Sequence, residues 1–234
     1  MNVNKLSKRL DRVVSYVIPG SKIADIGSDH AYLPCYAIKH GVASRAVAGE
    51  VVEGPYQAAI QQVNSSGLKD LIDVRKGNGL AVIEAGEVDC IVIAGMGGAL
   101  ITEILETGKE KLEGVKRLIL QPNLAANNIR RWMLENEWQL IHENILCEDN
   151  KSYEVLVAEK GNPYLPYTDE KKEILLGPYL LQEKNEIFQH KWLQEIQQWE
   201  KILQHLKSSE ENEANRRKQN ELLEKIDMVK EALS

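Results

Sequence analysis

The sequence has few cysteines, and those it has form no recognisable pattern. Three occur in 234 residues, widely separated, at Cys35, Cys90 and Cys147. An odd number of distant cysteines fits neither a disulfide framework nor the spacing of a zinc site. We therefore expect all three to be packing residues, and we expect no bound metal.

Long apolar runs are also missing. No segment reaches the roughly 18 consecutive apolar residues that a membrane-spanning helix needs. The first residues, MNVNKLSKRL, lack the apolar region of a signal peptide. The composition, 43% hydrophobic and 27% charged, is that of an ordinary globular chain. These features predict a cytoplasmic protein without a membrane partner, and we expect it to be a monomer.

Positive charge is not in excess, because the net charge is -6. Nucleic-acid binding would therefore have to depend on a local basic patch. The first predicted helix, residues 4–18, offers one such patch, with basic residues at helical spacing: Lys5, Lys8, Arg9 and Arg12. A second candidate pair is Arg130 and Arg131. A solvated helix face explains the first patch about as well as phosphate contact does.

Over its first 160 residues the chain alternates short apolar segments with amphipathic ones. Strands are predicted at 21–27, 45–50, 71–77, 88–95 and 116–123, with helices at 32–40, 55–66, 80–85, 99–107 and 124–137. This alternation predicts a parallel sheet covered on both faces. Two more strands, 138–149 and 152–161, have no helix between them and predict an antiparallel pair at one edge. Together these features predict the α/β fold of Rossmann-like class I methyltransferases.

The composition changes after residue 161, so we place a domain boundary there, with an α/β domain at 1–160 and a helical one at 161–234. Apolar residues then recur at steps of four and three in two runs: Trp192, Ile196, Trp199, Leu203 and Leu206, then Leu222, Ile226, Val229 and Leu233. This spacing predicts a coiled-coil hairpin. Ser208 and Glu211 fit a capping box that would begin the second helix. The hairpin could clamp RNA or a partner, but its aromatic stripe is more simply explained as core.

Glycine or acidic residues follow each of the first four predicted strands, at the sheet edge where doubly wound folds bind ligands. The candidates for cofactor binding are Asp25, Gly27, Ser28, Asp29, Glu50, Val51, Gly77, Asn78, Gly79, Gly95 and Met96. Gly27 would allow a close backbone turn, and an acidic residue about twenty positions later, here Glu50, can accept both hydroxyls of a ribose. The pattern predicts an adenosine-containing ligand.

Asp29 and His30 distinguish this loop from a dinucleotide-binding turn, where small residues let a pyrophosphate approach the helix. A carboxylate repels phosphate, but it tolerates a cationic ligand. S-adenosylmethionine, which has an adenosine, a sulfonium and no phosphate, fits this loop, whereas a nicotinamide cofactor does not. The simpler explanations are that Asp25 caps a strand end, that Asp29 is a helix N-cap and that His30 is a packing residue.

Several motifs resemble those of the bacterial tRNA (adenine-N1)-methyltransferases that modify adenine 22. They are LSKRL, ADIGSDHAYLP, AGE, GNGL, IAGMGG, LILQPN, YEVLVAE and LGPYLLQEKN, and together they span most of the chain. The resemblance implies methyl transfer from S-adenosylmethionine to an adenine of tRNA by a Rossmann-like domain with a coiled-coil appendage. It also implies a cofactor pocket lined by Asp25, Gly27, Asp29, Glu50, Asn78, Gly79 and Gly95.

The chemistry of the acceptor agrees with this resemblance. Ring N1 has an in-plane lone pair, so it can attack a methyl group without first losing a proton, once the base has left its stack. We predict catalytic roles for Asp29, which could stabilise the cationic product, for Tyr32, which could stack on the base, and for His30. Two alternatives stay open: a methyltransferase for another acceptor, and a non-catalytic adenosine-binding module whose tail recruits a partner.

Overall fold

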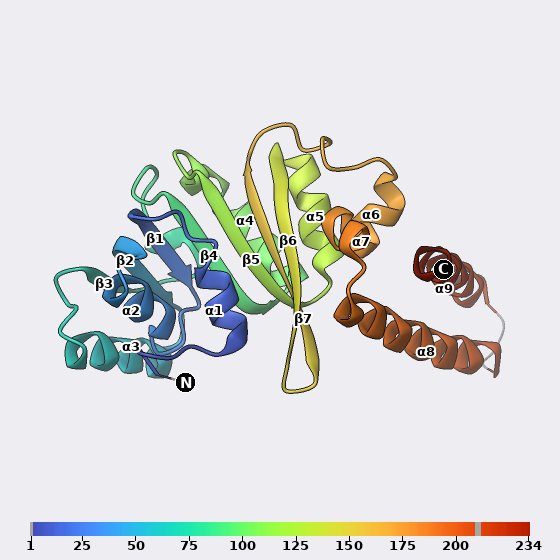
Figure 1. Ribbon diagram of the computed structural model, residues 1–234, viewed down its shortest axis with the longest axis horizontal. Helices are drawn as coiled ribbons and strands as arrows, with labels where there is room; N and C mark the ends of the chain where they lie inside the picture. The colour runs from blue at the N-terminus through green and yellow to red at the C-terminus, as the bar shows by residue number, and fades with distance from the viewer. Residues whose placement is uncertain (1, 209–211) are drawn as a thin grey trace. The chain divides into compact units, whose positions relative to one another are not determined.

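The computed structural model describes residues 2–208 and 212–234. Contacts divide the chain into two compact units, Met1–Pro166 and Tyr167–Ser234, a division that falls after Pro166, whereas the sequence indicated residue 160. The first unit is built on a large twisted sheet and the second is helical (Figure 1).

The first unit contains a seven-stranded sheet of order β3-β2-β1-β4-β5-β7-β6. Its strands are β1 (Ser21–Ile26), β2 (Ala43–Glu50), β3 (Ile72–Lys76), β4 (Cys90–Gly97), β5 (Arg117–Leu124), β6 (Trp138–Glu148) and β7 (Lys151–Lys160). Strands β1 to β5 pair in parallel, and β7 is antiparallel to both β5 and β6. The predicted doubly wound α/β fold with a final antiparallel pair is therefore confirmed.

Helices cover both faces of this sheet. The first face packs against α1 (Lys8–Val14), α2 (Tyr32–Lys39) and α3 (Glu53–Ser65) through one apolar cluster that includes Cys90 and Val92 of β4. Because side chains alternate along a strand, the buried Ile91 and Ile93 point to the other face, where α4 (Gly98–Thr107) contacts β4 and β5. The remaining elements of this unit are η1 (Gly79–Val82), η2 (Lys109–Leu112) and α5 (Ala126–Glu135).

The first helix is shorter than the predicted 4–18. It begins at Lys8, because Ser7 is its N-cap and accepts a hydrogen bond from Leu10 N at 3.2 Å. Before it, the Asn2 side chain accepts hydrogen bonds from the backbone N–H groups of Asn4 and Lys5, which forms a turn in place of helix. Lys5 therefore lies outside the helix, and the predicted face of four cations is wrong.

The second unit contains α6 (Glu170–Leu176), α7 (Pro178–Glu183), α8 (Glu186–Ser208) and α9 (Glu213–Leu233), of which the sequence indicated only the last two. Helices α8 and α9 pack together and bury Phe188, Trp192, Ile196, Leu203, Leu222, Ile226, Val229 and Ala232. Most residues of the two predicted apolar runs are therefore buried in the core of this unit.

The predicted capping box is wrong for Ser208. This residue is the last of α8, and its hydroxyl donates to His205 O. The N-cap of α9 is Asn212, whose side chain accepts from Asn215 N at 2.8 Å. Glu211, the other predicted partner, lies outside the described residues.

The cysteines do not all pack in the core. Cys35 and Cys90 are buried, but Cys147 is exposed, because it occupies an outward position on β6. Its predicted packing role is therefore wrong.

Within the described part of the chain, no three His, Cys, Asp or Glu side chains are grouped so that they could hold a metal ion. No helix among the same residues is both long and apolar enough to cross a membrane.

Candidate active site

A cavity of about 240 Å³ lies at the carboxyl ends of β1 and β4, next to the first helix. It is lined by Arg9, Leu10, Asp25, Gly27, Ser28, Asp29, Leu33, Ala94, Gly95 and Met96. Six of these residues were predicted to bind the cofactor. The structure therefore brings the residues after the first strand and those after the fourth strand to one site, as the strand-end rule requires.

The loop after β1 has an unusual backbone. Gly27, Asp29, His30 and Ala31 all have positive φ, at 72°, 40°, 65° and 52°. A Cβ at Gly27 would meet only Met96 Cε, the end of a flexible side chain, so it is chiefly the positive φ that favours glycine there. Left-handed conformations at non-glycine residues cost roughly 1 kcal/mol or more each, and such strain persists only where neighbouring structure enforces it.

The end of β2 enforces this loop conformation. Gly49 O accepts hydrogen bonds from Gly27 N at 2.9 Å and Ser28 N at 3.2 Å, and a Glu50 side-chain oxygen accepts one from Asp29 N. The N-cap of α2 is Ala31, which makes no side-chain capping bond, so Asp29 is not the N-cap that the simpler explanation required. The loop thus holds Asp29 at the rim of the cavity, where its side chain is 76% exposed.

Asp25 is the buried acid of the cavity, only 4% exposed. Burial raises its pKa to about 7, since desolvation disfavours the carboxylate. The hydrogen bond from Ser28 Oγ, 2.6 Å long, and the charge of Arg9 lower the pKa, and the nearby Glu50 raises it. A cationic ligand in the cavity would favour the ionised form, so the site matches a positively charged molecule.

Glu50 is the second buried acid, 6% exposed, at the end of β2. Its pKa is raised, because burial outweighs the hydrogen bond from Asp29 N. The backbone O of Glu50 accepts from Gly77 N at 2.9 Å, which ties the turn after β3 to the site. Just beyond it, Val51 is 57% exposed. Asn78 and Gly79 instead line a separate cavity of about 210 Å³ between η1 and α4.

Two residues near the carboxyl end of β5, Gln121 and Asn123, were not among the predicted site residues. Gln121 is fully buried, and its Oε1 accepts hydrogen bonds from Gly95 N, at 3.0 Å, and from the Arg9 guanidinium. Asn123 Nδ2 donates to Gly95 O at 2.7 Å. These two side-chain amides hold the carboxyl-terminal part of β4 in place. The sequence carried a signal for them, since both lie near the carboxyl end of a parallel strand, the edge where ligands bind in this fold.

His30 and Tyr32 form an aromatic pair beside Asp29. Their rings stack with centroids 5.5 Å apart and planes at 22°. The His30 Nε2 lies 3.6 Å from Asp29 Oδ1, and the His30 side chain is 47% exposed. The predicted catalytic residues therefore lie together; Asp29 and His30 are exposed, whereas Tyr32 is partly buried against the apolar cluster.

The cations predicted to bind phosphate on the first helix do not share one face, because Arg9 lies at the cavity and Lys5 lies before the helix. Arg9 lines the cavity, and its guanidinium lies over the Tyr153 ring at 5.5 Å. Lys8 and Arg12 are exposed on α1 and stay one helical turn apart, and Lys5 and Arg131 are also exposed.

The prediction of phosphate contact is wrong for Arg130. Its side chain is fully buried, and Nη2 lies 2.6 Å from carboxylate oxygens of both Glu143 and Glu154. Arg130 follows Ile129 on the inner face of α5, which packs on β6. Helical periodicity places it in the core, where two carboxylates satisfy its charge.

The sheet order, the two buried carboxylates at adjacent strand ends and the phosphate-incompatible loop define a class I methyltransferase with a site for S-adenosylmethionine. The sequence pattern of the tRNA (adenine(22)-N(1))-methyltransferases matches residues 23–231. The chain belongs to this family.

Individual relatives agree over the full length. The chain is 50% identical to the tRNA (adenine(22)-N(1))-methyltransferase of Bacillus subtilis over 235 residues, covering 100% of this chain and 99% of that protein. The crystal structure of the B. subtilis enzyme superposes with a TM-score of 0.95 at 49% identity, over 99% and 100% of the two chains. A Streptococcus pneumoniae putative tRNA (m1A22) methyltransferase in complex with S-adenosyl-L-methionine matches with a TM-score of 0.87 at 41% identity, over 98% and 100%.

Proposed function

We propose that this protein transfers a methyl group from S-adenosylmethionine to N1 of adenine 22 in tRNA. The observation that carries the proposal is the 50% identity to the B. subtilis enzyme across the whole chain. The acidic cavity supports it independently, because its chemistry selects a cationic adenosine ligand. We further propose that the protein works as a monomer in the cytoplasm, where its tRNA substrate is found.

The cavity residues fit this cofactor, which supplies an electrophilic methyl group when bound. Asp25 would stabilise its positive charge, since a buried carboxylate gains most from a cationic neighbour. Glu50 would accept the ribose hydroxyls, beside the exposed apolar surface of Val51. Gly27, Ser28, Gly95 and Met96 would shape the wall, and Gly77, Asn78 and Gly79 would extend the site along the ends of the strands.

Asp29, His30 and Tyr32 are proposed to act on the acceptor base. Adenine N1 attacks through its own lone pair, so no side chain has to remove a proton first. The exposed Asp29 carboxylate would stabilise the positive charge that develops on the methylated ring. The stacked rings of His30 and Tyr32 offer an aromatic surface for a base that has left its helix.

Mapping of modified nucleosides tests this function directly. We expect tRNA incubated with the protein and S-adenosylmethionine to gain one methyl group at N1 of adenine 22, as measured by mass spectrometry of nuclease fragments. A tRNA with guanine at position 22 is the matched control and should gain none. Asp29→Ala should slow transfer about 10-fold or more even at saturating cofactor; full transfer by this variant would remove Asp29 from the mechanism.

The same experiment decides between the alternatives. Methylation at another atom, or of a different acceptor only, would support a methyltransferase of other specificity. Cofactor binding with no transfer to tRNA, small molecules or protein would support a non-catalytic module whose helical tail recruits a partner.

We propose that Lys8 and Arg12 contact tRNA phosphates, with Lys5 and Arg131 as further exposed candidates. Reversing both charges in Lys8→Glu/Arg12→Glu should weaken tRNA binding and reduce the slope of log affinity against log salt by about 2, one for each phosphate that is no longer neutralised. Fluorescence titrations between about 50 and 200 mM salt would measure it. Cofactor affinity should stay unchanged, and an unaltered salt slope would contradict the proposal.

A further inference from the structure

A second cavity lies near the amino-terminal ends of β1 and β2. On β2, Ala46 and Ala48 belong to the apolar cluster under α2 and α3, so Arg45 and Val47 point to the opposite face. On that face the nearby cover is η1, a single four-residue turn whose Val82 would meet a side chain placed at Gly49. Arg45 is exposed on that face, whereas Val47 is buried.

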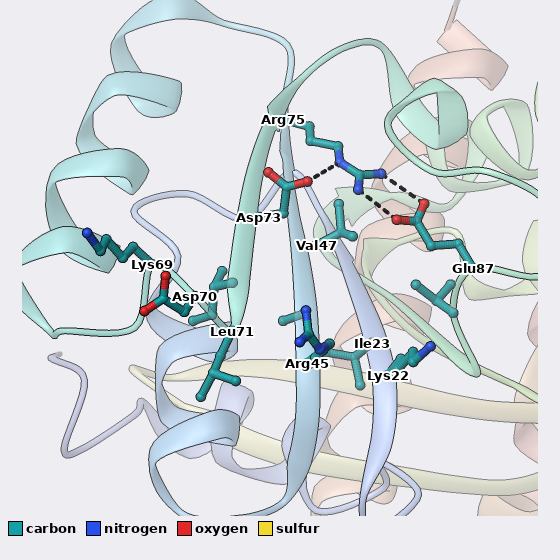
Figure 2. Close-up of a pocket in the computed structure, with 13 residues that line it drawn as sticks. Lys22, Ile23, Arg45, Val47, Lys69, Asp70, Leu71, Asp73, Arg75 and Glu87 are labelled. Atoms are coloured by element: carbon teal, nitrogen blue, oxygen red, sulfur yellow. Dashed lines mark hydrogen bonds and ion pairs between the residues drawn. The ribbon is translucent and has the colours of Figure 1, made fainter.

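This cavity has a volume of about 480 Å³, within the range of small-molecule sites. Figure 2 shows its lining, which combines charged side chains with the apolar Val47 and Leu71. The charged residues are Lys22, Arg45, Lys69, Asp70, Asp73, Arg75 and Glu87. None of them lines the catalytic cavity, which lies at the other end of the parallel strands.

Two of the three carboxylates in this lining are already paired with Arg75. Its Nε lies 2.7 Å from Asp73 Oδ2, and its two terminal nitrogens donate to the two Glu87 oxygens at 2.8 and 2.6 Å (Figure 2). Arg75 Nη1 also donates to Val82 O at 2.8 Å. This network fixes one wall of the cavity and leaves those carboxylates little capacity to neutralise other cations.

Lys22 and Arg45 remain as adjacent cations. They are register partners on the parallel strands β1 and β2 and point to the same face, so their charges repel. Lys22 feels the nearby charges of Glu87 and Asp89, but within the described residues the Arg45 side chain makes no hydrogen bond or ion pair. Lys69 adds a third exposed cation to the lining, next to Asp70. An anion bound here would relieve this repulsion.

We infer that this cavity is a phosphate-binding site, in which Arg45 and Lys22 hold a phosphate group and the apolar floor receives the attached sugar or base. Arginine provides a planar, forked set of donors that matches phosphate oxygens, and lysine adds a compact charge. The phosphate could belong to the tRNA backbone or to a free nucleotide. Arg45 lies five residues before Glu50 on β2, about 16 Å at 3.3 Å per residue, a distance that a few nucleotides of RNA can span.

The variant Lys22→Gln/Arg45→Gln tests the site, and Lys218→Gln/Lys225→Gln, which removes two exposed cations elsewhere, is the control. The tRNA source rests on the proposed function. It predicts that the salt slope of tRNA affinity falls by about 2 in the double variant and not in the control. The free-nucleotide source predicts that calorimetry detects adenosine monophosphate or inorganic phosphate binding to wild type and a loss of at least 10-fold in the double variant. Both variants should unfold at nearly the wild-type temperature, since substitutions of exposed side chains seldom change stability much.

Either response supports a phosphate site and identifies its source, and the absence of both overturns it. Methyl transfer by the wild type is measured separately, so the two proposals can fail independently. If the wild type methylates adenine 22, but the double variant keeps the salt slope of tRNA affinity and neither protein binds adenosine monophosphate or inorganic phosphate, only the phosphate site is refuted. Phosphate binding without any methyl transfer would refute the proposed function and leave the site intact.

Discussion

Replacing Asp25 with asparagine is expected to weaken S-adenosylmethionine binding by about 100-fold or more while making the free protein more stable at pH 8. The affinity falls because the amide keeps the shape of the side chain but loses the buried negative charge, and removing one member of a buried charge pair costs about 3–5 kcal/mol. The side-chain oxygen can still accept the hydrogen bond from Ser28 Oγ, so the loop should keep its conformation. Calorimetric titration measures the affinity.

The stability gain has a defined pH dependence. The pKa of Asp25 is about 7 in the folded protein and 3.8 in an exposed chain. Below pH about 4 both states are protonated, so the carboxyl costs nothing. As the pH rises to 7 the unfolded chain releases its proton while the folded protein retains it, and the free energy of unfolding falls. Above pH 7 the folded carboxylate is ionised and buried, so the free energy of unfolding has reached its lowest value and falls no further.

Urea unfolding of wild type and Asp25→Asn at pH 5 and pH 8 would measure this difference. The variant should exceed the wild type by roughly 2–4 kcal/mol at pH 8 and by clearly less at pH 5, since about three pKa units correspond to roughly 4 kcal/mol at most. Ser65→Ala, an exposed change on α3, is the control and should show no such pH dependence. Equal stability of variant and wild type at both pH values would contradict the raised pKa.

The fold was largely predictable because it depends on patterns with short periods. Buried strands such as Cys90–Gly97 appear as apolar runs, and turn residues such as Gly67 separate the elements. The residues at the carboxyl ends of β1 and β4 were predictable for a related reason. Parallel strands bring their ends to one edge, so residues far apart in sequence, such as Asp25 and Gly95, meet by topology alone.

What the sequence did not predict depends on interactions between distant segments. The start of α1 is decided by side-chain caps at Asn2 and Ser7, which compete with helix in a way that apolar spacing does not report. Arg9 was predicted as one of four surface cations on a helix, yet Gln121 of β5 holds it at the cavity. The left-handed turn at Asp29 likewise depends on hydrogen bonds that the loop donates to β2. Periodicity alone identifies a helix but not what each of its faces meets.

The neighbouring Arg130 and Arg131 differ most in what periodicity failed to predict, and we expect their substitution to have very different effects on stability. Arg130 is fully buried between Glu143 of β6 and Glu154 of β7, whereas Arg131 is exposed on the same helix. The triad joins α5 to the antiparallel strand pair. Arg130→Met should lower the free energy of unfolding by about 3–5 kcal/mol, because two buried carboxylates lose their counter-charge. Arg131→Met, the matched control, should change it by no more than about 0.5 kcal/mol.

A third variant separates the cost of unpaired charge from the loss of packing. In Arg130→Met/Glu143→Leu/Glu154→Leu no buried charge of the triad remains, so stability should return to within about 1 kcal/mol of the wild type or exceed it. If the triple variant is as unstable as Arg130→Met, the loss comes from packing rather than from charge. If Arg130→Met instead unfolds like the wild type but binds tRNA less tightly, Arg130 contacts RNA, and the buried triad does not describe its role. Chemical denaturation and tRNA titration on the same four proteins distinguish these results.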